Sequence, residues 1–551
     1  MKRVPGLTHP GICSKKSRKP QKGINDFMSK RVIIIGAGLA GLMAAHAAQR
    51  QGAAVLVVDR GPIGLGTNSA LANGVMSGPS ERYRAEDFVR DTLRAGGGLN
   101  RTSRVRLLAR EAPSGFQILR AVGIPLRERG TQRTVASPDP SVIPGVTLMR
   151  KLADHVRGLD NVHTLPGFCV TELLCRDGRV CGIRGFNRQG GQLEIEAPAV
   201  VLATGGAGAI YQRHDNQKRI MGQGYSLAAQ AGLDLLDMEF VQFYPLVLAD
   251  PGLPALIVYP PFAREAKLTG ASGVDILEKH GLADVNDAIV KKRDLFSALL
   301  YEEVRAGGVF LDLREVPSAA WDVHPLAIFK RLRFPFREKP VAVSPAVHFM
   351  MGGVRAAETG ETDMNGLFAC GEILWGLHGA NRLGGNALTE CIVTGALAGR
   401  FAAERALGSV PMPACTDRAK QPARPEGPGG MADYRDIHGR LRDAAWSGAG
   451  IVRAEGAMRE ALSSLEKIEE RLGQLVPQTV RERLLDCDLR AGALTLKAIL
   501  QAGIGRTESR GSFLRSDYAG QDDAGWRRNS CLKYDEGSRS FTVSYLPVEE
   551  T

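Results

Sequence analysis

The clearest hydrophobic pattern near the start of the chain is a short apolar run followed at once by closely spaced glycines. Residues 32–35 are all apolar, which predicts a strand buried on both faces of a parallel sheet. Glycines in a G-x-G-x-x-G pattern follow and open an alanine-rich helix that runs to about Gln51. A second apolar run begins at Ala54 and ends in Asp59. This order of strand, glycine turn, helix and strand predicts a βαβ unit.

The residues of this βαβ unit favour dinucleotide binding over an ordinary glycine-rich turn. Gly36 allows the tight turn, Gly38 lets the backbone approach a pyrophosphate, and Gly41 lets helix and strand pack closely. The helix N-terminus carries free N–H groups and partial positive charge, which suit phosphate. Asp59 follows at the distance expected of an acid that binds ribose hydroxyls.

Later patterns predict an interrupted nucleotide-binding domain with further domains around it. Strands are expected near 169–175, 180–186 and 199–202, and residues 366–403 return to the pattern of a strand, a glycine loop and a small-residue helix. Helical periodicity marks 434–472 and 477–504, whereas the end from Gly505 reads as irregular and charged. The predicted divisions are a basic leader (1–27), the first part of an FAD-binding domain (28–243), a capping domain (244–345), the second part of the FAD-binding domain (346–408), a linker (409–432), a helical domain (433–515) and a tail (516–551).

Composition narrows the classes of function. The net charge of +12 would be compatible with binding to nucleic acid. However, six of those net charges lie in residues 1–27. We therefore expect these residues to be a solvated tail, and we expect no nucleic-acid partner. Met28, just before the first strand, offers an alternative start. No apolar run reaches the roughly 18 residues of a membrane span. The leader has no secretory signal core, so the cytoplasm is the predicted location. The nine cysteines form no C-x-x-C pair, which argues against a cluster or metal site within the chain.

Five longer motifs, in order along the chain, carry a family resemblance. They are A-T-G-G-A-G (203–208), D-M-E-F-V-Q-F (237–243), H-F-M-M-G-G (348–353), G-L-F-A-C-G-E (366–372) and G-L-H-G-A-N-R-L-G-G-N (376–386). The chain resembles the flavoprotein subunit of succinate dehydrogenase and fumarate reductase, and its relative L-aspartate oxidase. The resemblance implies an α/β fold: a glutathione-reductase-like Rossmann domain that binds FAD, an inserted α+β capping domain and a C-terminal helical domain.

The resemblance also implies where FAD would lie. Membrane-bound relatives tether FAD to a histidine in a Ser-His-Thr loop, and the matching position here is Asn68, so we predict non-covalent FAD. The residues expected to contact the cofactor are Gly36, Gly38, Leu39, Ala40, Gly41, Asp59, Arg60, Thr67, Asn68, Ser69, Gly74, Ala203, Thr204, Gly205, Gly206, Gly371, Glu372, Arg382, Asn386, Ala387 and Leu388. Gln223 departs from the aspartate that the family usually has at its position.

The same resemblance assigns catalytic roles. His348 and Arg382 match the pair that binds the reactive carboxylate, and Arg can grip a carboxylate with two N–H groups. Arg293, at the start of a predicted capping-domain helix, matches the proton donor. Arg264 matches the arginine of the proton relay, while Pro261 stands where the family has a glutamate.

The other end of the substrate site departs from the family. The family's His-Pro-Thr, which holds a second carboxylate, is here Tyr244-Pro245-Leu246. A phenol and an apolar chain do not suit a desolvated carboxylate. Flavin reductases of urocanate, which are similar, also have tyrosine at the histidine position. We therefore predict an FAD-dependent oxidoreductase acting on a CH–CH bond of a small carboxylate whose distal group is not a free carboxylate.

Three alternatives stay open. The first is a true fumarate reductase or succinate dehydrogenase subunit, the second is L-aspartate oxidase, and the third is an electron-transfer subunit with a decayed substrate site. Electrons would come from or go to an iron–sulfur subunit or another external carrier. Through such a partner the protein would also associate with a membrane.

Overall fold

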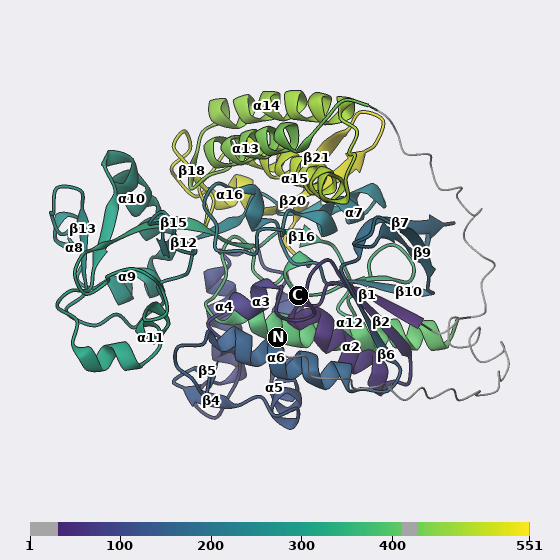
Figure 1. The fold of residues 1–551 in the computed structure, drawn as a ribbon, viewed down its shortest axis with the longest axis horizontal. Coiled ribbons are helices and arrows are strands. Elements are labelled where there is room, and N and C mark those ends of the chain that lie inside the picture. The colour runs from purple at the N-terminus through teal and green to yellow at the C-terminus, as the bar shows by residue number, and fades with distance from the viewer. Residues whose placement is uncertain (1–30, 410–426, 550–551) are drawn as a thin grey trace, which may run out of the picture.

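The computed structural model describes residues 31–409 and 427–549, and a five-stranded parallel sheet forms its centre (Figure 1). In spatial order its strands are β17 (Leu367–Ala369), β10 (Ala199–Leu202), β1 (Arg31–Ile35), β2 (Ala54–Asp59) and β6 (Val162–Pro166). Val32, Ile33 and Ile34 are fully buried, so the prediction of a strand covered on both faces is confirmed.

Alanine- and leucine-rich helices cover one face of this sheet. Val32 and Ile34 point into their core. The helices of this layer are α2 (Leu39–Arg50), α5 (Thr102–Ala121), α6 (Pro144–Arg157) and α12 (Asn386–Leu407). Nearby lie the short α3 (Asn68–Leu71), α4 (Ala85–Ala95) and a small sheet of β3 (Val75–Ser77), β5 (Gln132–Val135) and β4 (Leu126–Arg129).

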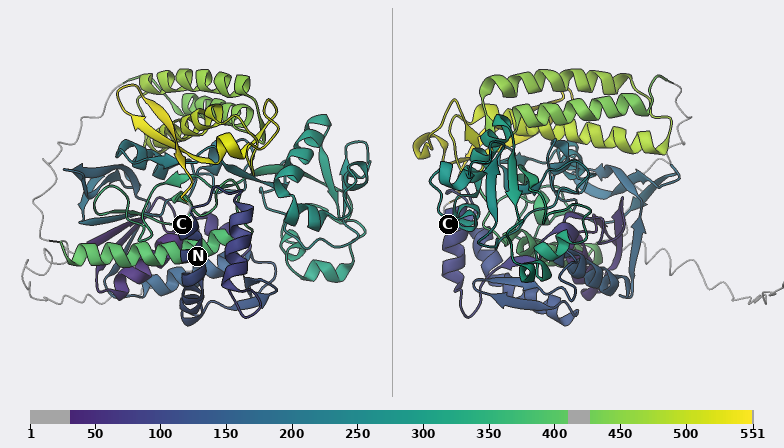
Figure 2. Two further views of the ribbon diagram at one scale, coloured as in Figure 1. Left: turned by 180° about the vertical axis from the view of Figure 1, so that it is seen from behind. Right: turned by 60° about the vertical axis from the view of Figure 1, so that its left-hand side comes forward.

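A second core lies on the opposite face, where Ile33 and Ile35 point. It is closed by a three-stranded sheet of β7 (Cys169–Arg176), β8 (Arg179–Phe186) and β9 (Gln192–Glu196), with α7 (Gln223–Gln230) and the short η1 (Gly208–Ile210) and η3 (Gly371–Ile373). Three long helices pack above it: α13 (Met431–Gly448), α14 (Glu455–Gln474) and α15 (Val480–Gly505). The right-hand view of Figure 2 shows them stacked as one layer, as the helical periodicity predicts.

Local sequence explains how α15 begins. Thr479 accepts a hydrogen bond from the Glu482 N–H, and Glu482 accepts one from the Thr479 N–H, so the helix opens with a capping box.

The cap stands to one side of the sheet domain (Figure 1) and has its own hydrophobic core. Its sheet has the order β12 (Val241–Leu248), β15 (Val341–Met350), β14 (Val309–Asp312) and β13 (Lys267–Gly270). Around it lie α8 (Ile276–Lys279), α9 (Val285–Lys291), α10 (Arg293–Ala306), η2 (Ser318–Asp322) and α11 (Leu326–Phe329). The predicted cap limits, 244 and 345, fall within β12 and β15, the two strands that join the cap to the rest.

The C-terminal region is more ordered than the sequence suggests. Residues 505–549 read as irregular, and this is wrong for β20 (Arg528–Asp535) and β21 (Ser540–Pro547), which form a hairpin. The hairpin extends a sheet with β11 (Leu235–Leu236) and β16 (Gly353–Val354). The two strands pair with each other along their whole length, and only β20 also pairs with the distant β11. The remaining elements are β18 (Val452–Arg453), β19 (Leu514–Arg515) and α16 (Asp523–Trp526).

The predicted basic leader and residues 410–426 of the predicted linker lie outside the described residues. Within the two described ranges, none of the helices has the length and hydropathy that crossing a bilayer requires. The same ranges contain no group of three or more His, Cys, Asp or Glu side chains arranged to hold a metal ion.

Candidate active site

Two adjoining cavities lie where the sheet domain meets the cap. A narrow cleft runs along the carboxyl ends of β1, β2 and β10, and a larger cavity of about 1200 Å³ opens between the sheet domain and the cap. Asn68, Ser69, Glu372 and Cys391 line both, so the two form one continuous site.

The glycine turn shapes the floor of the cleft. Gly36 has φ +109°, and a Cβ there would lie 2.2 Å from the Ala203 carbonyl oxygen. A Cβ on Gly41 would lie 2.0 Å from the Gly36 oxygen, so neither position accepts a side chain. The Leu39 N–H, in the first turn of α2, donates to Ser69 Oγ at 3.1 Å. The cleft therefore exposes backbone and a helix N-terminus, which suits a pyrophosphate.

Asp59 closes the far end of the cleft. Its carboxylate accepts from the Ala37 N–H at 2.8 Å and from the Gly61 N–H at 2.6 Å, which fixes its orientation. Beside it, Arg60 forms an ion pair with Asp488 of α15 and donates to the Arg219 carbonyl at 2.9 Å. Gln223 also donates to Asp488. Asp488, a residue that sequence reasoning missed, therefore orients Arg60 and Gln223, which both line the cleft.

Most of the other predicted cofactor residues line the two cavities. Thr67, Ala203, Thr204, Gly205 and Gly371 line the cleft, while Gly74, Ala387 and Leu388 line the larger cavity. Thr204 Oγ1 is buried and has no hydrogen-bond partner among the described residues, so it is available to a ligand.

Three predicted cofactor residues, Gly41, Gly206 and Asn386, line neither cavity. Asn386 is fully buried and donates to Thr92 Oγ1 at 3.1 Å, so it holds the start of α12. Gly206 packs under Glu372, since a Cβ there would lie 2.3 Å from Glu372 Oε1. Glu372 accepts from the Met350 N–H at 3.2 Å, and burial raises the pKa of Glu372 to about 7.

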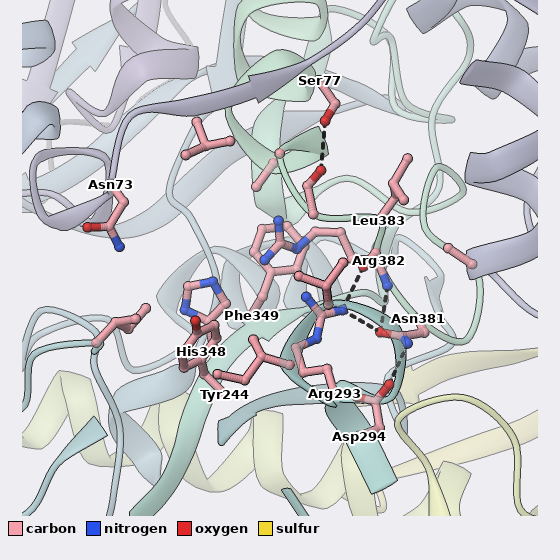
Figure 3. Close-up of a pocket in the computed structure, with 18 of the residues that line it drawn as sticks. Asn73, Ser77, Tyr244, Arg293, Asp294, His348, Phe349, Asn381, Arg382 and Leu383 are labelled. Carbon is pink, nitrogen blue, oxygen red and sulfur yellow. Dashed lines mark hydrogen bonds between the residues drawn. The ribbon is translucent and has the colours of Figure 1, made fainter. Parts of the chain in front are cut away.

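Four of the predicted substrate residues converge on the larger cavity from four separate segments (Figure 3). His348 lies on β15 and Tyr244 on β12. The register of these two strands shifts at His348, and the Tyr244 and His348 rings are 5.8 Å apart. Arg293 opens α10, and Arg382 lies in the loop before α12.

Arg382, which is buried, and Arg293, which is half-buried, form a positive site. Arg382 donates to Gln242 Oε1 at 2.9 Å and lies over the Phe349 ring at 4.6 Å. Arg293 donates to Asn381 Oδ1 at 2.9 Å and to the Arg382 carbonyl at 2.7 Å. Burial and the neighbouring Arg293 lower the pKa of Arg382 to about 10. The Nε atoms of both arginines are buried without an acceptor in the described chain, which leaves room for an anion.

Two tyrosines line the same cavity as the arginines. The Tyr244 hydroxyl is buried and has no hydrogen-bond partner among the described residues. Tyr259, which sequence reasoning missed because it lies in an irregular loop, is close enough to Arg382 and Arg293 for their charges to act on its hydroxyl. Leu246 is fully buried in the cap core and lines neither cavity.

Arg264 does not join this group. Its side chain is exposed, and it lines neither cavity. In this structure the polar neighbours of Arg293 are Asn381 and the Arg382 carbonyl, and Asn381 in turn donates to Asp294.

Family models identify the chain. Residues 31–388 match the model described as FAD binding domain, and residues 438–551 match the one described as fumarate reductase flavoprotein C-term. The chain belongs to the fumarate reductase and succinate dehydrogenase flavoprotein family. The family expected from the motifs is confirmed, and with it FAD as the cofactor and an FAD-dependent oxidoreductase as the class of enzyme.

Relatives span nearly the whole chain. It is 30% identical over 541 residues to a fumarate reductase (CoM/CoB) subunit of Methanothermobacter marburgensis, covering 91% of this chain and 96% of that one. It is 32% identical over 538 residues to L-aspartate oxidase of Agrobacterium fabrum, covering 92% and 95%. Among solved structures it is similar to the E. coli quinol fumarate reductase chain FrdA, with TM-score 0.82, 25% identity and coverage of 95% and 97%. The fold of this flavoprotein family, with FAD-binding, capping and C-terminal domains, is therefore confirmed.

Proposed function

We propose that this flavoenzyme interconverts an α,β-unsaturated carboxylate and its saturated form, and that the distal group of the substrate is uncharged. The observation that carries the proposal is the buried phenol of Tyr244, which has no partner in the described chain. It lines the same cavity as two guanidinium groups with free Nε atoms, at the position where the family has a histidine.

Arg382 and His348 would bind the reactive carboxylate, and Arg293 would hold and deliver the proton at the α-carbon. FAD, when bound, exchanges hydride with the β-carbon. Fixed positive charge beside the carboxylate stabilises the charge that develops there in the transition state, and a water-poor site strengthens this effect. Arg264 is exposed, so a relay through it has no support in the geometry, and Asn381 and Asp294 are the polar groups that adjoin Arg293.

Fumarate or succinate would place a second carboxylate against the Tyr244 phenol. A desolvated carboxylate without a cation or several N–H donors costs several kcal/mol. A neutral carbonyl, amide or ring needs only one hydrogen bond, which the Tyr244 hydroxyl can donate. Tyr244 therefore favours a neutral distal group over a dicarboxylate.

A second candidate is oxidation of L-aspartate, because a relative at 32% identity bears that name. L-aspartate also carries two carboxylates, so the phenol of Tyr244 argues against it as well.

Anaerobic reoxidation of the dithionite-reduced protein tests the proposal. An enoate such as crotonate should restore the oxidised flavin spectrum within the mixing experiment, whereas butyrate should not. A protein that reacts with dyes but with no enoate would instead be an electron-transfer subunit.

We further propose that FAD is bound without a covalent link. The Asn68 amide donates to Asn216 and accepts from the Gln217 N–H, and an amide does not form the linkage that relatives make through histidine. Acid precipitation should leave FAD in the supernatant; yellow colour in the washed pellet would contradict this. Electrons would be exchanged with a separate carrier or an iron–sulfur subunit, which would also be the route to a membrane.

A further inference from the structure

Asp215 contacts the His348 ring and lines the same cavity. His348 Nδ1 and Asp215 Oδ2 are 2.7 Å apart. The Asp215 side chain is 6% exposed, whereas that of His348 is 26% exposed. A nearly buried carboxylate therefore touches one ring nitrogen, while the other side of the ring remains accessible.

The backbone fixes Asp215 against β15. The Asp215 N–H donates to the Val347 carbonyl at 3.2 Å, and the Val347 N–H donates to the Arg213 carbonyl at 3.0 Å. The Asn216 side chain donates to Asp215 Oδ1 at 2.9 Å. One carboxylate oxygen therefore accepts from Asn216, and the other is left to accept from the imidazole.

This arrangement continues to the loop beside the expected flavin. Asn68 Nδ2 donates to Asn216 Oδ1 at 2.7 Å, and the Gln217 N–H donates to Asn68 Oδ1 at 2.9 Å. Asn68 stands where covalent relatives carry their tethering histidine. Here its side chain instead anchors the segment that carries Asp215.

We propose that Asp215 is a positioning residue for His348. A carboxylate can only accept, so Nδ1 carries the proton and Nε2 is the nitrogen that the ring presents to the cavity. Since Nδ1–H is committed to Asp215, His348 can donate to a substrate carboxylate from Nε2 only as the imidazolium. Asp215 then balances that charge. This proposal rests on the carboxylate-binding role proposed above for His348.

Histidine ¹⁵N spectra of the FAD-loaded full-length protein test the tautomer without any turnover. His348 is assigned from the signals lost in His348→Gln. In the wild type the neutral ring should carry its proton on Nδ1, and in Asp215→Asn the Nε2–H form should appear, because an amide can donate to Nδ1. An Nε2–H ring in the wild type, or a tautomer that Asp215→Asn leaves unchanged, would overturn the proposal.

Kinetics with crotonate provide the second readout. Asp215→Asn should raise KM about 10- to 100-fold with a smaller change in kcat, the range seen when a partner that orients a histidine is lost. Asp215→Glu, which keeps the acceptor, should recover part of the loss. Asp234→Asn is the control, because Asp234 pairs with Arg355 and lines neither cavity.

The outcomes separate positioning from folding. Asp215→Asn should keep the FAD content and melting temperature of the Asp234→Asn control. Loss of FAD or early melting would make Asp215 structural and overturn the proposal. Absence of enoate turnover in the wild type would instead contradict the proposed function, and the tautomer result would still decide the role of Asp215.

Discussion

The buried, incompletely paired guanidinium of Arg382 indicates that an anionic ligand binds beside it. It is 6% exposed, its Nε has no acceptor in the described chain, and Arg293 adds a second positive charge beside it. Such a group is costly unless an anion completes it. The reactive carboxylate is the anion that the proposed chemistry supplies.

Arg382→Gln should lower kcat/KM for an enoate by about 100- to 1000-fold, because a fixed donor to developing charge is lost. Steady-state assays with a reduced dye measure this. Arg305→Gln, an exposed position on α10, is the matched control and should leave kcat/KM unchanged. If Arg382→Gln and Arg305→Gln had equal kcat/KM, Arg382 would not bind the reactive carboxylate.

Glu372 makes stability depend on pH. Burial raises its pKa to about 7, whereas the pKa of a glutamate in the unfolded chain is about 4.3. The native state therefore holds a proton that the unfolded state loses in this window, so the free energy of unfolding falls as pH rises from about 4.3 to about 7. Glu372→Gln should flatten part of that slope in thermal melts of the holoenzyme.

Asp237 limits how much of the slope disappears, because burial raises its pKa to about 7 as well. Glu315→Gln, at an exposed site, is the control. A slope identical in Glu372→Gln and Glu315→Gln would contradict the assignment.

At the scale of elements, α2 and α12 position the cofactor cleft by packing backbone against backbone. A Cβ on Gly399 would lie 2.1 Å from the Ala44 carbonyl oxygen, and one on Gly395 would lie 2.4 Å from that of Ala40. Small residues at these positions let α12 hold α2, whose N-terminus faces the cleft.

Gly399→Ala should destabilise the protein by about 1–3 kcal/mol and weaken FAD retention, because the helices must separate. Thermal melting and the FAD released on dilution measure both effects. Gly439→Ala, on the exposed face of α13 with open space around it, should instead be neutral or stabilise by about 0.5–1 kcal/mol. If Gly399→Ala changed neither the melting temperature nor FAD retention, the close packing of α2 and α12 would not be needed.

Elements with local signatures were predictable. The apolar run of β1, the glycine turn and the small-residue α12 each follow from residues close in sequence. The hairpin β20–β21 is also local, since its two strands pair with each other along their whole length, and sequence reasoning missed it. Its attachment to β11 was not predictable, because β11 lies almost 300 residues earlier.

At the scale of the whole molecule, distant segments complete the site. Asp488 of the helical domain pairs with Arg60 of the cleft, Tyr259 lines the cavity from a cap loop, and Asp215 contacts His348 from an irregular segment. None lies in a motif, so the motifs predicted Arg382, His348, Arg293 and Tyr244 but not the residues that hold or surround them. Arg264 shows the converse, since it fits a motif and lies on the surface.

Buried ion pairs connect the C-terminal region to the strand that enters the cap. Arg506 forms buried ion pairs with Glu239 at 2.8 Å and with Glu508 at 2.9 Å, and Arg510 pairs with Glu508 at 2.7 Å. These contacts fasten residues 506–510 to the segment just before β12. The strand that carries Tyr244 is thereby tied to the C-terminal region.

The ratio of kcat/KM for the monoamide of fumaric acid to that for fumarate tests the central claim most directly. The two substrates share a carbon skeleton and a reactive carboxylate and differ only in the charge at the distal end. Because an unpaired buried carboxylate costs several kcal/mol, the wild-type enzyme should prefer the monoamide by about 100-fold or more. Equal turnover of the two, or a preference for fumarate, would contradict the account.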